Sequence, residues 1–456
     1  MDAYGALFRG VLFPAWEGVL RGRPTFSILS ELRRSEWASE DELAARQSKD
    51  LGALLRHAWE HVPFDRWRME DAGVSPHDVR DVSDLAKIPI VRRRELTDTV
   101  RVRSSTVPPF PSITKSTSGT MGTPLTFAYD EGSEYFRQAT KLRGYGWAGY
   151  LPGDAAVHYW GASPSAPSRA NAAKIALDRH LRRDTYVDCG RRDEASLDAM
   201  VRTLRAERPR ALVCYAQAGA DLARHVVDRG LRDWDDVRVL TAAERLFPSD
   251  RAVIERAFGP HVFETYGSRE VMLIASECEA HDGLHVSMEN LVVEIVVTED
   301  GRERPAAVGE TGEVVLTDLH NYGMPFVRYA NGDLATKKAP GRCACGRSLE
   351  RLSSVDGRVT ESLRDGRGGR VGGLVFNVVI VALSDAIRTF QIVQYGDDSV
   401  TLRIVPSARF DEDARAVLLR TAERYLPGLP IRIELVDELP TSASGKRQVV
   451  VVHPPS

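Results

Sequence analysis

Short β-rich segments alternate with helical segments through the middle of the chain, from about residue 100 to residue 335. The β-rich segments include HVFETY at 261–266 and LVVEIVV at 291–297. The helical segments include residues 196–207 and the run AQAGADLARHVVDRG at 216–230. An alternation of this kind is typical of strands that are joined by helices. It therefore predicts an α/β body.

The length and the distribution of Gly and Arg predict a second, smaller domain. With 456 residues, the chain exceeds what one hydrophobic core usually supports. The stretch RVTESLRDGRGGRVGG at 358–373 is rich in Gly and Arg and poor in apolar residues, as at a boundary or hinge. The sequence beyond it reads as strand, helix and strand. We therefore expect a large domain over 1–357, with a helical segment over 1–75, and a small α+β domain over 358–456.

Charge, hydropathy and cysteine content exclude several classes of protein. The 61 basic and 64 acidic side chains give a formal net charge of -3, so the chain lacks the basic surface that nucleic acid requires. No apolar run approaches the roughly 18 to 20 residues that cross a bilayer. Five cysteines in so long a chain favour the reducing cytoplasm over a disulfide scaffold. We expect a cytoplasmic globular protein with no nucleic-acid partner and no membrane span.

The first 24 residues are amphipathic, but Arg9 interrupts them and no small-residue cleavage site follows. We interpret them as a helix that docks on the body, with a membrane-surface helix as the alternative. Two further helices, broken near Pro63, are expected within residues 40–75.

The segment KSTSGTMGTP at 115–124 combines five Ser or Thr residues with two Gly residues. A loop of small residues can turn its backbone amides toward an anion, and hydroxyl groups add donors that suit tetrahedral oxygens. Lys115 precedes the loop and the Walker A spacing is absent, so this is not a P-loop. Polyphosphate binding and a flexible solvated turn both fit the composition.

Three more motifs follow the loop in the chain: YGSRE at 266–270, RYANGD at 328–333 and SASGK at 442–446. In this order, the four motifs resemble those of the adenylate-forming superfamily of acyl-CoA synthetases. The segments DLAKIPIVRRREL, ECEAHDGLHV and CACGR resemble the phenylacetate-CoA ligase and CapK branch. The resemblance implies a large multi-sheet N-terminal domain and a small, mobile α+β domain that closes over the site.

The resemblance also implies a role for each motif residue. Lys446 would reach from the small domain and place its ammonium group between the carboxylate and the α-phosphate, while Glu270 would bind Mg²⁺. Tyr266 would stack on adenine, with a core aromatic as the alternative, and Asp333 would accept hydrogen bonds from ribose, with a turn residue as the alternative. The complete set of expected nucleotide contacts is Ser116, Thr117, Ser118, Gly119, Thr120, Gly122, Thr123, Tyr266, Gly267, Asp333 and Arg358. Family members usually have Lys at the position of Thr123, and Arg358 also marks the expected hinge.

Cys278, His285, Cys343 and Cys345 together offer four ligands of the kind that zinc prefers. Their spacing alone leaves free thiols as an alternative, and His281 competes with His285 as the nitrogen ligand. The resemblance favours zinc, which would be structural because the protein would fill all four positions.

Together with the motifs, the resemblance implies an ATP-dependent enzyme that adenylates an aryl or arylacetic acid and transfers the acyl group to coenzyme A. One alternative keeps the adenylation step but uses an amine or a carrier thiol as the acceptor, or activates an inorganic anion such as nitrite in place of the carboxylate. The others are a phosphotransferase that releases ADP and a catalytically silent ATP-binding protein. Trp160 and Tyr215 are candidate walls of the acid pocket. A homodimer is the default expectation for the assembly.

Overall fold

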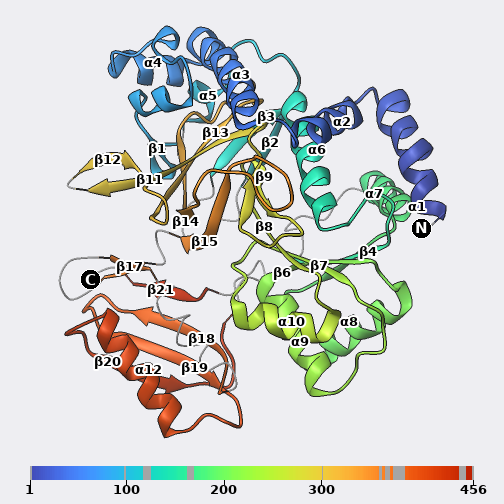
Figure 1. The fold of residues 1–456 in the computed structure, drawn as a ribbon, viewed down its shortest axis with the longest axis vertical. Helices are drawn as coiled ribbons and strands as arrows, with labels where there is room; N and C mark the ends of the chain where they lie inside the picture. The colour runs from blue at the N-terminus through green and yellow to red at the C-terminus, as the bar shows by residue number, and fades with distance from the viewer. Residues whose placement is uncertain are drawn as a thin grey trace.

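The protein is represented by a computed structural model, which describes residues 3–96, 99–116, 125–161, 169–299, 301–358, 362–364, 370–372, 386–440 and 448–453. A mixed sheet of 13 strands runs through the N-terminal part of the molecule, in the order β12-β11-β13-β14-β15-β10-β9-β8-β7-β6-β4-β5, with β1 paired to β14 (Figure 1). Its strands are β1 Val91–Arg92, β4 Ala156–Trp160, β5 Asp184–Asp188, β6 Ala211–Tyr215, β7 Arg238–Ala242, β8 Val262–Ser268, β9 Met272–Glu277, β10 Leu284–Val286, β11 Leu291–Glu299, β12 Arg302–Pro305, β13 Thr311–Asp318, β14 Tyr329–Lys337 and β15 Arg351–Arg358.

Strand β8 joins the two halves of this sheet. It pairs in parallel with β7, which continues a parallel set through β6, β4 and β5. On its other side β8 pairs antiparallel with β9, where the antiparallel half begins. The carboxyl ends of the parallel strands and the turn after β8 therefore lie at one edge.

Three helices cover one face of the parallel half and bury its largest core cluster: α8 Glu194–Glu207, α9 Ala216–Asp228 and α10 Pro248–Phe258 (Figure 1). In α8, Asp193 caps the first turn by accepting a hydrogen bond from Ser196 N, and the apolar side chains recur at helical spacing. The expected helices at 196–207 and 216–230 correspond to α8 and α9, so the α/β prediction is confirmed.

The N-terminal region is helical, as expected. Helix α3 ends at His61 and α4 begins at Pro63, because Pro is accepted at the first position of a helix but not in its interior. The first residues contact the body through Tyr4, whose hydroxyl donates to Leu181 O at 2.7 Å, and through an Arg9–Asp154 ion pair at 3.1 Å. The elements here are α1 Ala3–Leu7, π-helices Phe8–Leu12 and Ala15–Leu20, α2 Thr25–Ser35, α3 Glu40–His61, α4 Pro63–Asp71, 3₁₀ helices Pro76–Asp78, Val82–Lys87 and Arg93–Leu96, and α5 Val100–Arg103.

The remaining elements of the large part are the hairpin of β2 Ser112–Ser116 and β3 Thr126–Asp130, followed by α6 Glu131–Trp147 and, after β4, α7 Arg169–Arg182. Among the described residues, no helix combines the length and the apolar character that crossing a lipid bilayer requires.

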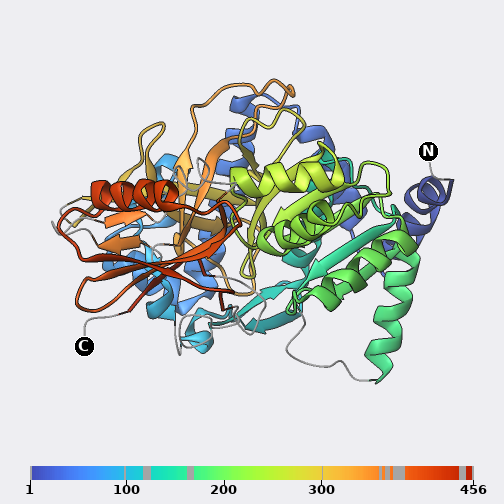
Figure 2. The ribbon, with the colours of Figure 1, turned by 90° about the horizontal axis from the view of Figure 1, so that it is seen from below.

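The C-terminal part has its own sheet and core. Four strands pair in the order β20-β19-β18-β21, and Figure 2 shows α12 along one face of them. Phe390 of β18 lies 6.3 Å, centroid to centroid, from Phe247 of the large part. The division after residue 357 stays a prediction. The elements are β16 Ser362–Arg364, β17 Arg370–Gly372, β18 Ile387–Gln394, β19 Val400–Pro406, α12 Glu412–Tyr425, β20 Ile431–Leu435 and β21 Val450–Val452.

Helix α6 is held against the sheet by two buried ion pairs. Arg137 donates to Asp318 at 2.7 Å, and Arg143 donates two hydrogen bonds to Glu289 at 2.6 and 2.9 Å. Both Arg143 and Glu289 are 1% exposed. At Gly144, an added Cβ would lie 2.5 Å from a methyl carbon of Leu273, so the helix lies directly on β9. The position of β9 therefore depends on α6.

We predict that Arg143→Met lowers the free energy of unfolding by about 3 to 5 kcal/mol, because it leaves the buried Glu289 carboxylate without its cation. Urea titrations followed by circular dichroism would measure the change. Arg304→Met, which removes an exposed pair with Glu310, is the matched control and should unfold like the wild type. Equal losses in the two variants would contradict the prediction.

Candidate functional site

The end of β8 and the turn that follows it bear three of the residues singled out in the sequence: Tyr266 and Gly267 in the strand, and Glu270 in the turn. An added Cβ at Gly267 would lie 2.2 Å from the carbonyl oxygen of Met272, so only glycine fits this position. Met272 itself has a φ of 65°, in the left-handed region. The register of the β8–β9 pair shifts between Tyr266 and Gly267. The local sequence therefore produces a tight, irregular turn.

Tyr266, Asn331 and Asp333 form a hydrogen-bonded triangle between β8 and β14. Asp333 Oδ2 accepts from the Tyr266 hydroxyl and from Asn331 Nδ2, both at 2.8 Å. Asn331 Nδ2 also lies 2.8 Å from the Tyr266 hydroxyl, and Asp333 N donates to Asn331 Oδ1 at 3.0 Å. Tyr266 is 7% exposed, and part of its ring belongs to the core. Two residues that the motifs placed 67 positions apart are therefore in direct contact.

Glu270 is 6% exposed and lies beside a tyrosine and an arginine. The Tyr329 hydroxyl donates to Glu270 Oε1 at 3.3 Å, and Arg93 Nη1 lies 4.0 Å from the same oxygen. Burial and the Glu270 carboxylate raise the pKa of Tyr329 above its usual range, so the hydroxyl stays protonated and donates. The site thus holds an ionisable carboxylate with one neutral donor and one cation nearby.

Sequence reasoning missed Asn331, Tyr329 and Arg93. Asn331 and Tyr329 lie within the RYANGD motif. The motif indicated that this segment is functional, but it gave no reason to choose these two side chains over their neighbours. Arg93 lies 177 residues before Glu270, and only the fold brings them together.

Of the predicted phosphate loop, the structure describes only Ser116. Ser116 is the last residue of β2 and pairs in register with Thr126. The other loop residues, at 117–123, and Lys446 lie outside the described residues. Arg358 is the last residue of β15, where its backbone is in register with Asp333. Asp333 and the start of the expected hinge are therefore neighbours on adjacent strands.

Trp160 and Tyr215, the candidate walls of an acid pocket, contact each other edge to face with ring centroids 4.6 Å apart. They end β4 and β6, which are neighbours in the parallel half of the sheet. Their role in binding an acid stays a prediction.

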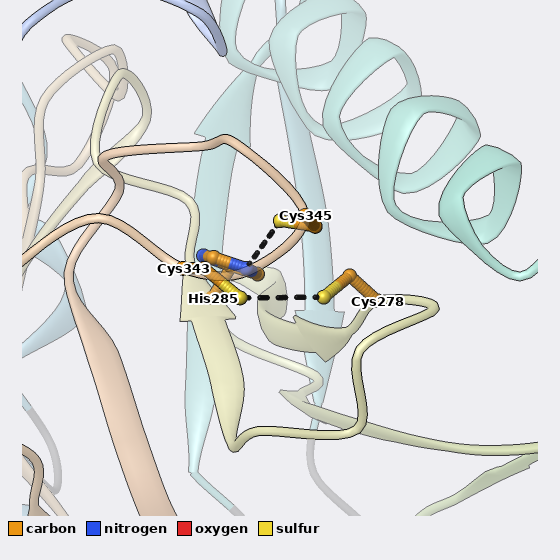
Figure 3. Close-up of side chains that lie close together, drawn as sticks. All are labelled: Cys278, His285, Cys343 and Cys345. Carbon is orange, nitrogen blue, oxygen red and sulfur yellow. Dashed lines mark hydrogen bonds between the residues drawn. The ribbon is translucent and has the colours of Figure 1, made fainter.

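Four possible metal ligands have their ligand atoms all within 4.8 Å of one another (Figure 3). Cys278 directly follows β9, His285 lies on β10, and Cys343 and Cys345 lie in the loop after β14. The Cys278 and Cys343 sulfurs are 3.9 Å apart, and Cys345 Sγ lies 3.4 Å from His285 Nε2. Four ligands around a tetrahedral zinc ion lie about 3.5 to 3.8 Å apart, whereas sulfurs in a disulfide are about 2 Å apart. The Cys278–Cys343 and Cys345–His285 distances are thus close to those between the ligands of a tetrahedral zinc ion, and the cysteines are free thiols.

The surroundings of this cluster suit metal ligands. Burial lowers the pKa of His285 to about 4, which keeps the imidazole neutral. Burial opposes ionisation of Cys345, but hydrogen bonds from Arg347 and from the Cys343 and Cys278 thiols together outweigh it and lower the pKa of this thiol. Burial raises the pKa of the Cys278 thiol. His281 lies apart, with Nδ1 3.4 Å from Glu277 Oε1. Between the two candidate histidines, the fold thus selects His285.

Two carboxylates lie close together beside the site. Glu264 lies on β8 two residues before Tyr266, and its backbone N donates to Glu277 Oε2 at 2.7 Å. Burial, reinforced by the negative charge of Glu277, raises the pKa of Glu264 to about 7. Arg251 and Arg245 oppose this shift without cancelling it.

We predict that Glu264→Gln stabilises the protein at pH 8 and has little effect at pH 5. The Glu264 carboxyl ionises near pH 4.5 when unfolded and near pH 7 when folded. Between these values the folded state binds more protons, so stability falls as pH rises, by at most about 3 kcal/mol. Unfolding free energies of both proteins at pH 5, 7 and 8 would measure this. A difference that is constant with pH would contradict the prediction.

The fold is that of known acyl-CoA ligases. The chain superposes on a 2-hydroxyisobutyryl-CoA ligase solved in the postadenylation state in complex with R3-HIB-AMP, with a TM-score of 0.74, 20% identity and coverage of 92% of this chain and 91% of that chain. A family model described as the CapK C-terminal domain matches residues 363–453.

Curated relatives cover most of the sequence. A phenylacetate-coenzyme A ligase of Thermus thermophilus is 26% identical over 368 residues, which is 78% of this chain and 79% of that protein. A phenylacetate-coenzyme A ligase of Escherichia coli (strain K12) is 30% identical over 350 residues, which is 72% of this chain and 74% of that protein. This identity over most of both proteins, together with the matching fold, shows that the chain belongs to the phenylacetate-coenzyme A ligase family.

Proposed function

We propose that the protein activates a carboxylic acid with ATP, releases pyrophosphate, and transfers the acyl group from the acyl-adenylate to coenzyme A. The observation on which this rests is the triangle of Tyr266, Asn331 and Asp333 beside the buried Glu270, in a member of this ligase family. We propose an aryl or arylacetic acid as the substrate, because aromatic side chains end β4 and β6.

The nucleoside would bind where side chains of β8 and β14 contact each other. Asp333 would accept hydrogen bonds from the ribose hydroxyls, and Asn331 and the Tyr266 hydroxyl would orient its carboxylate for that task. The Tyr266 ring would stack on adenine. A preoriented acceptor loses little freedom when the nucleotide binds, which favours binding.

The acid and the α-phosphate are both anionic, so the site must neutralise charge and align the attack. The Glu270 carboxylate is the oxygen ligand that Mg²⁺ prefers, and its position beside Tyr329 and Arg93 fits this role. Mg²⁺ would supply positive charge at the phosphates. Ser116 and residues 117–123 would surround the β- and γ-phosphates, and Lys446 would stabilise the charge that shifts during attack. Arg358 would contact the nucleotide at the hinge.

The acceptor of the acyl group distinguishes the alternatives. Coenzyme A is favoured by the named relatives. An amine, a carrier thiol or activation of an inorganic anion such as nitrite would use the same first step, and a silent ATP-binding protein would use neither step. A homodimer remains an expectation.

We predict that ATP–pyrophosphate exchange appears with at least one member of a panel of benzoic, arylacetic and short aliphatic acids. Adding coenzyme A should then accelerate AMP release and produce the thioester. Lys446→Ala should lower exchange roughly 100-fold or more, because it removes a cation that faces the transition state.

The matched control for that experiment is Lys174→Ala, which removes an exposed lysine from α7 and should leave exchange unchanged. Absence of exchange with every acid would refute adenylation of these acids. Exchange without thioester formation would refute coenzyme A as the acceptor and favour one of the other acceptors.

We further propose that the Cys278, His285, Cys343 and Cys345 cluster binds a structural zinc ion. The donor set of three thiols and one neutral imidazole fits zinc, and the distances between donors fit its tetrahedral geometry. With four protein ligands, the ion would join β9, β10 and the loop after β14 and take no part in the reaction.

We predict about one zinc ion per chain in protein purified without added metal, measured by elemental analysis. Cys343→Ser and Cys345→Ser should lose the metal and unfold at lower temperature, because metal binding contributes directly to folding free energy. Cys189→Ser, which changes a buried cysteine in another core cluster, is the control and should keep its zinc. A wild-type protein without stoichiometric metal would contradict the proposal.

A further inference from the structure

Asp356 is a buried carboxylate on β15 that no motif singled out. Its side chain is 3% exposed. It accepts hydrogen bonds from Thr336 Oγ1 at 2.6 Å, from Ser354 Oγ at 2.9 Å and from Arg245 Nη1 at 3.2 Å. Thr336 and Ser354 lie on the hairpin of β14 and β15 itself, so Arg245 is the partner that comes from elsewhere in the fold.

Arg245 extends from the loop between β7 and α10, residues 243–247. This loop leaves β7 through Ala243, which has a φ of 66°, in the left-handed region that non-glycine residues rarely adopt. Glu244 fixes the loop on one side, because its carboxylate accepts from Gln217 N at 3.0 Å at the start of α9. A constrained backbone therefore directs Arg245 toward the hairpin.

The hairpin that Arg245 contacts also bears the proposed nucleotide residues. Asp333 lies on β14 three residues before Thr336, and its register partner on β15 is Arg358, two residues after Asp356. On its other side Asp333 accepts from Tyr266 of β8. The carboxylate that would meet ribose is therefore fixed to β8 directly, and its hairpin is fixed to the β7–α10 loop through Arg245.

The same loop contacts the C-terminal part of the protein. The Arg245 guanidinium carbon lies 5.6 Å from the ring centroid of Phe247, and Phe247 packs against Phe390 of β18. Arg245 thus contacts Asp356, close to the start of the expected hinge, and also Phe247, which packs against the small sheet.

We propose that Arg245 is a positioning residue for the nucleotide site, acting through its ion pair with Asp356 to hold the β14–β15 hairpin against the β7–α10 loop. This inference rests on the proposed function, because it assumes that Asp333 and Arg358 contact ATP. Arg245 itself touches neither the ribose nor the reacting atoms. Without its cation, Asp356 would be a buried charge held by two hydroxyl groups, and the hairpin would lose its link to the loop.

Arg251 provides the matched control. It lies six residues further along the chain, is 25% exposed where Arg245 is 23% exposed, and donates to both oxygens of Glu277 at 2.9 and 2.8 Å. Its ion pair joins α10 to β9 and does not involve the β14–β15 hairpin. Loss of this pair therefore shows how an arginine–carboxylate ion pair in this region affects the stability of the protein when the β14–β15 hairpin is not involved.

The experiment measures ATP affinity by isothermal titration calorimetry and the melting temperature of the full chain for the wild type, Arg245→Met, Arg245→Lys, Asp356→Asn and Arg251→Met. We expect Arg245→Met to weaken ATP binding about tenfold or more, and Arg245→Lys to recover part of the loss because it restores a cation without the planar fork. Arg251→Met should lower the melting temperature and keep wild-type affinity for ATP. In ATP–pyrophosphate exchange, Arg245→Met should raise the KM for ATP more than it lowers kcat.

Unchanged ATP affinity in a folded Arg245→Met protein would overturn the inference. If that variant does not fold, wild-type affinity in both Arg245→Lys and Asp356→Asn would overturn it equally. Equal loss of affinity in Arg251→Met would also overturn it, because the effect would then be one of general stability. A wild-type protein that binds ATP but adenylates no acid would contradict the proposed function. The comparison of ATP affinities between the wild type and the variants would still decide whether Arg245 positions the nucleotide site.

Discussion

The position of the candidate site depends on how β8 pairs with its two neighbouring strands. This strand is parallel to β7 on one side and antiparallel to β9 on the other, and the change requires a tight turn directly after it. Gly267 makes the turn feasible, because any side chain there would collide with the carbonyl of Met272. The aromatic ring of Tyr266 and the carboxylate of Glu270 owe their position at the carboxyl edge of the parallel strands to this turn.

Two hairpins, β8–β9 and β14–β15, meet at the site through their side chains, and each is also fixed by contacts with other parts of the fold. The first lies against α6, which two buried arginine–carboxylate pairs hold in place. The second is joined to the first by Tyr266 and to the β7–α10 loop by Arg245. Buried polar groups thus define the relative position of the hairpins, whereas the apolar cores of the three helices and of the small sheet define the layers.

Local patterns predicted the elements of the fold well, because helix spacing, the break at Pro63 and the β-rich runs are properties of short segments. The sequence could not predict that thirteen strands form one sheet, since strand order is determined by contacts between distant segments. The same limit applies to the site. The motifs indicated Tyr266 and Asp333, but the contact between Arg93 and Glu270 has no local signal, and the choice of His285 over His281 depended on how β9 and β10 pair.

The two outer strands of the large sheet are the places where a strand of another molecule could pair with it. An outer strand exposes unpaired backbone groups, which can recruit a strand of another molecule and begin aggregation. Here one outer strand, β12, is only four residues long, has three charged side chains and ends in proline. The other, β5, begins and ends with aspartate. Short length, charged side chains and a residue without a backbone donor all oppose the growth of such intermolecular sheets.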